Sequence, residues 1–246
     1  MSDARVAVVT GGATGIGAAI ALRLAQDGHA VAVNYAHSEA AADQLVHQIK
    51  ATGGRAISVQ ADVSDASQAA RLIDRAAEGL GAPPTILINN AGLFRPGSAR
   101  RMPPAAWDQI IGVNLNGAFY CTHAVLPAMY ENGWGRVVFL GSPSGGRAIS
   151  PGTSAYAAAK AGLVALTQVL AIEAAGRGVT VNTVIPGFVD TAMTQDGDRE
   201  NTLANAWPQI PPSAIADTIA HLVSDRAAYV SGEQVGVWLG GPGMTA

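Results

Sequence analysis

A tyrosine and a lysine four residues apart carry the clearest chemical signal in this chain. Tyr156 and Lys160 lie in an alanine-rich segment that predicts a helix, and their spacing places both side chains on one helix face. An ammonium group beside a phenol favours the phenolate and so lowers the pKa of the tyrosine. Because an unperturbed phenol titrates at about 10, such a shift lets it exchange protons near neutral pH. The pair predicts acid–base chemistry on a substrate oxygen, although such a tyrosine taken alone is more typical of a packed aromatic side chain.

A glycine-rich turn near the N-terminus predicts the partner of this chemistry. Residues 5–9 form an apolar run typical of a buried parallel strand, and residues 10–17 read T-G-G-A-T-G-I-G before a helix. Gly11 permits a tight turn, Gly15 lets the backbone approach a pyrophosphate, and Gly17 lets helix and strand pack closely. The helix N-terminus offers N–H groups to phosphates. The spacing differs from the general dinucleotide fingerprint, so in isolation the segment could also be an ordinary glycine-rich connection.

The elements that must position these residues alternate between short apolar runs and longer amphipathic segments. This alternation predicts an α/β fold, a Rossmann-type doubly wound parallel sheet with helices on both faces. Seven strands are expected at residues 6–9, 30–34, 56–60, 86–89, 135–140, 180–185 and 234–239. Helices are expected to begin near residues 16, 39, 65, 104, 154 and 213. No linker or repeat interrupts the pattern, so residues 1–246 are expected to form one domain, with a substrate loop at about 190–212.

The composition excludes several classes of function. A formal net charge of -3 leaves no basic footprint for nucleic acid. The single Cys121 excludes an intrachain disulfide and a cysteine-rich metal site, and the five histidines show no metal-ligand spacing, so no metal is expected. No uninterrupted apolar run approaches 20 residues and no signal peptide is recognisable, so we expect a cytoplasmic protein without a membrane span.

Polar and glycine residues gather where the predicted strands end, which is where open α/β sheets bind ligands. Asp62 and Val63 follow the third strand, residues 89–92 (N-N-A-G) end the fourth, and Ser142 ends the fifth. Residues 186–187 (P-G) end the sixth strand, and Asn114 lies within a helical pattern.

Together these motifs resemble the single-domain branch of the short-chain dehydrogenase/reductase family over nearly the whole chain. The matching segments are residues 10–17 (T-G-x-x-x-G-x-G), 89–92 (N-N-A-G), 156–160 (Y-x-x-x-K) and 186–187 (P-G), together with Ser142 and Asn114. Each motif is weak alone, but all of them in this order are specific. Asn182 and residues 186–189 and 227–232 look most similar to 3-oxoacyl-ACP reductases and acetoacetyl-CoA reductases.

The resemblance implies a role for each catalytic residue. Tyr156 is expected to protonate the carbonyl oxygen as general acid during reduction, and to act as general base during alcohol oxidation. Lys160 is expected to lower the pKa of the tyrosine and to bind the nicotinamide ribose. Ser142 is expected to donate to the developing oxyanion. Asn114 is expected to hold a water near Lys160, although it could also be a helix residue satisfied by backbone groups.

The resemblance also implies a set of cofactor contacts. They are Thr10, Gly11, Thr14, Gly15, Ile16, Gly17, Asn34, Tyr35, His37, Ser38, Asp62, Val63, Asn89, Ala91, Gly92, Tyr156, Lys160, Pro186, Gly187, Val189 and Thr191. Asp62 is expected to accept from the adenine amino group, although it could instead cap the following helix. Tyr35 stands where NAD-preferring relatives carry aspartate, and His37 and Ser38 could bind a 2′-phosphate, so NADP(H) is favoured and NAD(H) is possible.

The expected function is reduction of a ketone, either a 3-oxoacyl thioester or a small carbonyl compound, to a secondary alcohol. The alternatives are an alcohol, polyol or steroid dehydrogenase working in oxidation, and a non-catalytic cofactor-binding regulator. Trp207, residues 194–205, and Phe94 or Arg95 are expected to shape the substrate pocket. Arg95, Arg100 and Arg101 could also attract the phosphates of an acyl carrier or be solvated surface charges. A homotetramer is expected by resemblance. Two departures from the family are one extra residue between Ser142 and Tyr156, and leucine at position 239.

Overall fold

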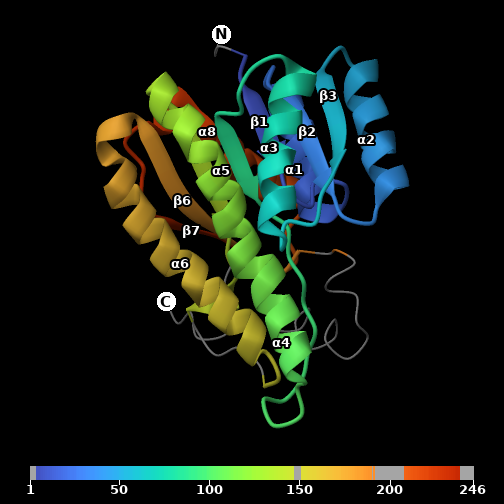
Figure 1. Cartoon of the computed structure of the whole chain (residues 1–246), viewed down its shortest axis with the longest axis vertical. Helices are drawn as coiled ribbons and strands as arrows, with labels where there is room; N and C mark the ends of the chain where they lie inside the picture. Colours follow the sequence, from blue (N-terminus) through green and yellow to red (C-terminus); the bar gives the residue numbers. More distant parts are fainter. Residues whose placement is uncertain (1–3, 147–150, 190, 192–207, 239–246) are drawn as a thin grey trace.

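A seven-stranded parallel sheet forms the centre of the computed structural model, which describes residues 4–146, 151–189, 191 and 208–238 (Figure 1). The strand order is β3-β2-β1-β4-β5-β6-β7, so the direction of winding reverses between β1 and β4. The strands are β1 (Val6–Val9), β2 (Ala30–Tyr35), β3 (Arg55–Gln60), β4 (Ile86–Asn89), β5 (Gly135–Leu140), β6 (Val179–Pro186) and β7 (Gln234–Val237). The predicted fold class is confirmed. The reversal also places a ligand crevice at the carboxyl ends of β1 and β4.

Helices cover both faces of the sheet. The α-helices are α1 (Gly15–Gln26), α2 (Glu39–Ala51), α3 (Ala66–Leu80), α4 (Pro104–Ile111), α5 (Gly117–Asn132), α6 (Ser154–Ala174) and α8 (Pro212–Val223). Short turns are the π-helix η1 (Gly112–Asn116) and the 3-10 helices η2 (Pro143–Gly145), η3 (Ala175–Arg177) and η4 (Asp225–Ala227). One apolar core lies under α1, α2 and α8, and the other under α3, α5 and α6.

The two cores explain why the central strands carry apolar side chains on both faces. Ala7 and Val9 face the core under α1, whereas Val6 and Val8 face the core under α3. Successive side chains of a strand point to opposite faces, so a sheet covered on both sides must be apolar throughout. All residues of β1, β2, β4 and β5 are buried accordingly.

Several boundaries differ from the sequence expectation, most by a single residue, and three of the differences bear on the site. The helix expected from residue 104 is divided into α4, η1 and α5, with Asn114 inside the π-helical turn. The third helix begins at Ala66 because Asp65 is its N-cap. Strand β7 ends at Val237, and Leu239 lies outside the described residues.

Helix α6 carries the most apolar long segment of the described chain. Residues Ser154–Arg177 meet the length and composition of a membrane-crossing helix, with a mean hydropathy of 1.5 in the most apolar window. The sequence expectation missed this segment because Lys160 and Glu173 interrupt its apolar run. A core helix meets the same criteria, and α6 packs along β6 and buries Lys160.

Candidate active site

The glycine-rich turn between β1 and α1 has the conformation that its sequence predicts. Gly11 and Gly15 have φ angles of 57° and 55°, in the left-handed region that glycine adopts without strain. At Gly17 a Cβ atom would lie 2.4 Å from the carbonyl oxygen of Gly11, which leaves no room for a side chain. The three glycines therefore let the turn fold back against the start of α1.

The N-terminus of α1 is open to an anion. Thr14 is the N-cap residue, but its side chain makes no capping hydrogen bond, and the first turn of the helix contains no acidic residue. The first N–H groups of α1 are therefore not capped by this side chain, and the positive end of the helix dipole is not neutralised. Thr191 lies against the same turn, because a Cβ atom on Gly15 would be 3.3 Å from its Cγ2 atom. This arrangement can hold a phosphate group.

The side chain of Asn34, at the end of β2, is hydrogen-bonded to the glycine turn. Its Oδ1 atom accepts from the N–H group of Gly11 at 3.1 Å, and its Nδ2 atom donates to the carbonyls of Val59 and Ala61 at 3.2 and 3.0 Å. The side chain is buried and all of its strong partners are backbone groups. Asn34 thus joins the turn to the end of β3, which is a positioning role, and its contact with the cofactor stays a prediction.

Thr10 and Asn90 hold the same turn from the side of β4. The Oγ1 atom of Thr10 accepts from the N–H groups of Asn90 and Ala91, both at 3.0 Å. Asn90 Nδ2 donates in return to the carbonyls of Thr10 and Gly11, both at 2.9 Å. Asn90 belongs to the N-N-A-G motif, but the sequence alone predicted no role for its side chain. The side chain of its neighbour Asn89 points into the interior, where Nδ2 donates to Thr122 of α5 at 3.0 Å.

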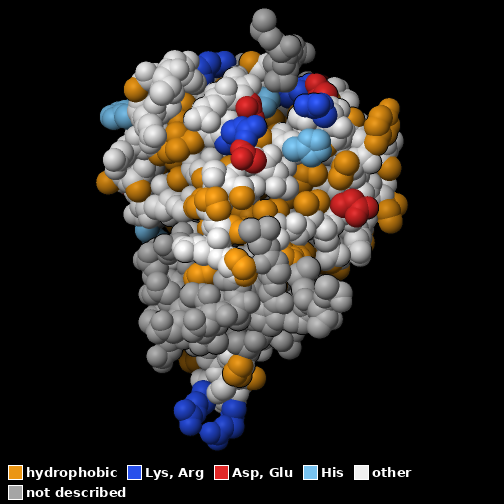
Figure 2. Space-filling view, turned by 180° about the vertical axis from the view of Figure 1, so that it is seen from behind, with side chains coloured by type: hydrophobic (Ala, Val, Ile, Leu, Met, Phe, Trp, Pro, Cys, Tyr) orange, Lys and Arg blue, Asp and Glu red, His pale blue; other side chains and the backbone are white. Residues whose placement is uncertain are grey.

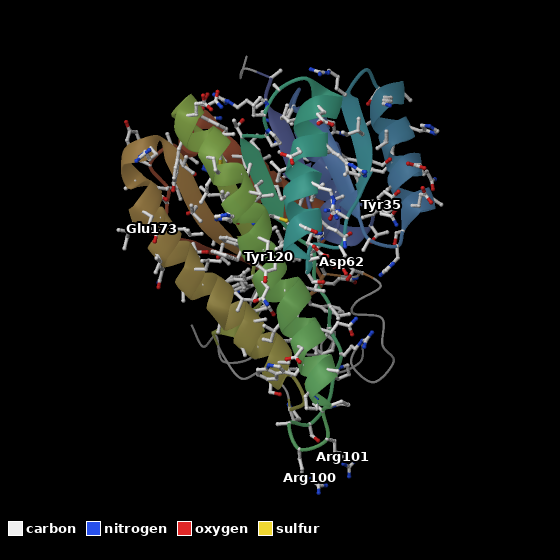
Figure 3. The ribbon with its side chains drawn as sticks, in the orientation of Figure 1. Tyr35, Asp62, Arg100, Arg101, Tyr120 and Glu173 are labelled. Carbon is white, nitrogen blue, oxygen red and sulfur yellow. The ribbon has the colours of Figure 1, made fainter. Side chains whose placement is uncertain are left out.

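The expected 2′ pocket lies at the end of β2, where Tyr35 is labelled in Figure 3. The Tyr35 ring is buried in the core, and its hydroxyl donates to Glu39 Oε1 at 3.3 Å. Burial, followed by the charge of Glu39, raises the pKa of this phenol. His37 and Ser38 are exposed, and Ser38 forms no side-chain cap on α2. The groups open to a 2′-phosphate are thus His37, Ser38 and the N-terminus of α2, with the Glu39 carboxylate nearby.

Asp62 was expected either to contact adenine or to cap the following helix, and the structure gives the capping role to Asp65. Asp62 Oδ1 accepts from the backbone N–H and the hydroxyl of Ser64, at 2.9 and 2.7 Å, and forms a local turn at the end of β3 (Figure 3). Asp65 caps α3, and hydrogen bonds from Ser67 and Gln68 lower its pKa to about 2. The alternative that Asp62 caps this helix is therefore wrong, and its carboxylate stays exposed at the sheet edge where adenine binding was expected. Val63, beside it, is buried against Gly117.

Lys160 and Tyr156 meet on α6 as their spacing predicts. The Nζ atom of Lys160 lies 5.5 Å from the centroid of the Tyr156 ring and donates to the carbonyl of Leu140 at 2.7 Å. The lysine side chain is buried, and the loss of solvation lowers its pKa to about 8. At neutral pH the ammonium form still predominates. The phenol therefore has a buried positive charge next to it, as its proposed acid–base role requires.

Phe94, Ser142 and Gly145 complete the surroundings of this pair, and of the three only Ser142 was predicted from the sequence to be catalytic. The ring of Phe94 packs edge-on against the Tyr156 ring, with centroids 5.2 Å apart. Ser142 begins η2, and its Oγ atom accepts from the N–H group of Ser144 at 3.2 Å. Gly145 brings η2 against the α6 backbone, because a Cβ atom there would lie 2.7 Å from the carbonyl carbon of Lys160. The η2 turn that carries Ser142 is thereby seated on the helix that carries Tyr156.

Asn114 lies inside the π-helical turn that separates α4 from α5. Its Nδ2 atom donates to the carbonyls of Leu93 and Ile110 at 2.8 and 2.9 Å, and its Oδ1 atom accepts from the N–H group of Leu93 at 3.4 Å. The alternative of a side chain satisfied by backbone groups is confirmed. Asn114 thereby fixes the start of the loop that carries Phe94.

The segment after β6 is described only in part. Gly187 donates its N–H to Val237 at 2.9 Å, and Val189 pairs with Ile210 in a short parallel bridge. These contacts place Pro186, Gly187 and Val189 at the same sheet edge as the glycine turn. Trp207 and residues 194–205 lie outside the described residues. Within the described part of the chain, no group of three or more potential metal ligands occurs.

Comparison with known proteins agrees with this geometry. The family model described as short chain dehydrogenase matches residues 5–202. The 3-oxoacyl-[acyl-carrier-protein] reductase FabG of Staphylococcus aureus is 39% identical over 243 residues, which cover 96% of this chain and 98% of the relative. The acetoacetyl-CoA reductase of Allochromatium vinosum is 42% identical over 240 residues, which cover 95% of this chain and 97% of the relative.

A solved structure shows the same architecture. The short chain dehydrogenase from Burkholderia cenocepacia J2315 in complex with NADP superposes with a TM-score of 0.90 at 37% identity, covering 96% of this chain and 97% of that one. The chain therefore belongs to the short chain dehydrogenase family, and it is an oxidoreductase.

Proposed function

We propose that this protein reduces a 3-oxoacyl thioester, or a small ketone, to a secondary alcohol with NADPH. The observation that carries the proposal is the placement of Tyr156 beside the buried Lys160, at the sheet edge that also holds the open turn before α1. Two of the similar proteins are named for reduction of a 3-oxoacyl carrier thioester and of acetoacetyl-CoA, which supports the thioester over a simple ketone.

The fit of a dinucleotide to the turn rests on space and hydrogen bonding. Left-handed glycines at 11 and 15, together with the excluded Cβ at Gly17, bring the backbone close to where a pyrophosphate would lie. The N–H groups at the start of α1 would bind that pyrophosphate, and His37 and Ser38 would bind the 2′-phosphate. A structural relative is described in complex with NADP. The absence of a carboxylate at Tyr35 favours NADPH, and Glu39 in the first turn of α2 keeps the preference moderate.

The proton chemistry follows from the positions of the side chains. Bound NADPH would supply a hydride to the carbonyl carbon, and negative charge would develop on the carbonyl oxygen. Tyr156 would donate its phenolic proton to that oxygen, and Ser142 would stabilise the charge by a hydrogen bond. The Lys160 ammonium would stabilise the phenolate that remains until it is reprotonated.

The assembly, the location and the substrate loop extend the proposal. Phe119 on α5 and Val169 and Ile172 on α6 are exposed apolar side chains, with Ile172 78% exposed. Such an outer face is suited to packing against other copies of the chain, and we propose that α5 and α6 carry the contacts of a cytoplasmic homotetramer. We also propose that residues 1–246 form a single domain with a substrate loop at about 190–212.

Removal of one oxygen atom tests the mechanism. Tyr156→Phe should lower kcat for acetoacetyl-CoA by at least about 100-fold, because general acid catalysis contributes that much or more, and should leave NADPH binding unchanged. Ser142→Ala is the companion variant, and NADPH fluorescence titration is the binding control. Full turnover by Tyr156→Phe would refute the assigned role. Turnover of alcohols with NADP⁺ but of no ketone would favour the oxidative reading, and cofactor binding without turnover of either class would favour a regulator.

A further inference from the structure

Three arginines lie on the loop that leads from β4 to α4. Arg95, Arg100 and Arg101 are all exposed, and we name them the arginine tip. They are three of the 15 basic residues of a chain whose net charge is -3. Figure 3 shows Arg100 and Arg101 at the far end of the molecule, beyond the carboxyl ends of the strands. Figure 2 shows basic side chains there without acidic ones beside them on that face.

The loop that carries the arginine tip is held in place by its own backbone. The carbonyl of Ser98 accepts from the N–H groups of Arg101 and Met102, at 2.9 and 3.0 Å, which closes a tight turn around Arg100. The Met102 side chain packs on Gly97, where an added Cβ would lie 3.3 Å from its Cε atom. The turn therefore presents two adjacent guanidinium groups outward, and neither forms a salt bridge with the described residues.

The same loop is joined to the candidate active site at two points. Its first part carries Phe94, whose ring packs on Tyr156. Further along, the N–H group of Gly97 donates to the carbonyl of Gly152 at 2.9 Å, four residues before Tyr156 in the sequence. A substrate whose carbonyl lies at Tyr156 and whose remaining length leaves the site along this loop would reach the arginine tip.

We propose that the arginine tip binds the phosphate groups of a coenzyme A thioester while its acyl end lies at Tyr156. This inference rests on the proposed function and assigns the recognition of the far end of the substrate. Guanidinium groups bind phosphates in a bidentate manner, and a pair on one turn suits a compact polyanion. An acidic carrier protein would need an interface of about 800 Å² on each partner. The two adjacent guanidinium groups, those of Arg100 and Arg101, are instead confined to one turn, which favours the small ligand.

The test compares two thioesters that share the reacting group. Acetoacetyl-CoA carries the phosphates, whereas acetoacetyl-N-acetylcysteamine has none. In Arg100→Gln/Arg101→Gln the KM for acetoacetyl-CoA should rise about 5- to 30-fold, as expected for the loss of two exposed charge-assisted contacts, with kcat changed less than about twofold. The KM for the phosphate-free thioester should stay unchanged. Added salt should raise the wild-type KM for the CoA ester alone.

A matched control separates a local site from general electrostatics. Arg71→Gln/Arg75→Gln removes two exposed arginines one turn apart on α3, and should leave both KM values unchanged. An equal rise in KM in both double variants, or a rise for both thioesters, would overturn the proposal. An effect of Arg100→Gln/Arg101→Gln confined to an acetoacetyl carrier protein would also overturn it, and would assign the tip to protein docking.

A binding measurement that requires no turnover tests this inference separately from the proposed function. If the wild-type protein reduces neither thioester, the proposed reduction of thioesters fails. Calorimetric titration of the NADP⁺-loaded protein with free coenzyme A still tests the tip, since the same double variant should weaken that binding 5- to 30-fold by the same contacts. Equal binding by wild type and variant would refute the phosphate site, whatever the protein reduces.

Discussion

Replacement of the buried catalytic lysine should stabilise the protein relative to its wild type at neutral pH. Burial lowers the pKa of Lys160 from 10.5 to about 8, so the folded state holds this charge at a cost. The difference corresponds to about 3 kcal/mol below pH 8. Lys160→Met removes the charge and keeps the length of the side chain, but it leaves the carbonyl of Leu140 without its donor at a cost of about 1–3 kcal/mol. We expect a net gain of about 1 kcal/mol, or a Tm higher by about 2–4 °C.

The pH dependence of the stability difference between Lys160→Met and wild type tests the reasoning more sharply than its value at one pH. A lysine with a lowered pKa in the folded state binds fewer protons there than in the unfolded state, so the stability of the wild type rises with pH. The rise begins near the folded pKa of about 8 and ends near the unfolded value of 10.5. Lys160→Met lacks this group, so its advantage at pH 7 should turn into a deficit by pH 10.

Chemical denaturation of the cofactor-free protein at pH 7, 8, 9 and 10 measures this change. Lys50→Met is the control, since Lys50 is the only other lysine of the chain and is exposed at the end of α2. Its difference from wild type should not vary with pH. A difference between Lys160→Met and wild type that stays constant from pH 7 to pH 10 would show that burial does not lower the pKa of Lys160, and would refute the expected gain in stability.

Three further substitutions test other parts of the site. Tyr35→Asp should lower the NADPH to NADH ratio of kcat/KM, because a carboxylate repels a 2′-phosphate; an unchanged ratio would show that the 2′ pocket is elsewhere. Gly145→Ala should lower kcat by about 10-fold or more while cofactor binding persists, because its Cβ would meet the Lys160 backbone at 2.7 Å and displace η2; wild-type kcat would refute that packing. Asn114→Ala should lower the unfolding free energy by about 2–4 kcal/mol through the loss of its hydrogen bonds to Leu93 and Ile110, and loss of turnover at unchanged stability would instead indicate a purely catalytic role.

Several parts of the site could be predicted because their signals are local in the sequence. The turn before α1 needs left-handed backbone at Gly11 and Gly15, and only glycine adopts it freely, so the residue types state the conformation. Tyr156 and Lys160 meet because a helix places residues four apart on one face. The apolar strands reveal a sheet covered on both sides, since no other parallel arrangement buries every side chain.

Other parts depend on contacts between segments distant in the sequence. Asn34 and Thr10 are predicted cofactor contacts, and the structure adds that each bonds to backbone more than 20 residues away and builds the turn itself. Asn114 was placed correctly in a helical segment, yet its partner Leu93 and the π-helical turn are not visible in a helical pattern. Which aspartate caps α3 depends on where the helix begins. It begins at Ala66, so the cap is Asp65 rather than Asp62.

The sequence by itself therefore determined the fold class, the phosphate turn and the identity of the acid–base pair, because backbone conformation and helical periodicity are properties of adjacent residues. Only the tertiary structure decided how deeply Lys160 is buried, which asparagines build the site, and where the arginine tip stands relative to Tyr156. Burial and through-space distance are sums over neighbours that the chain brings together only when it folds.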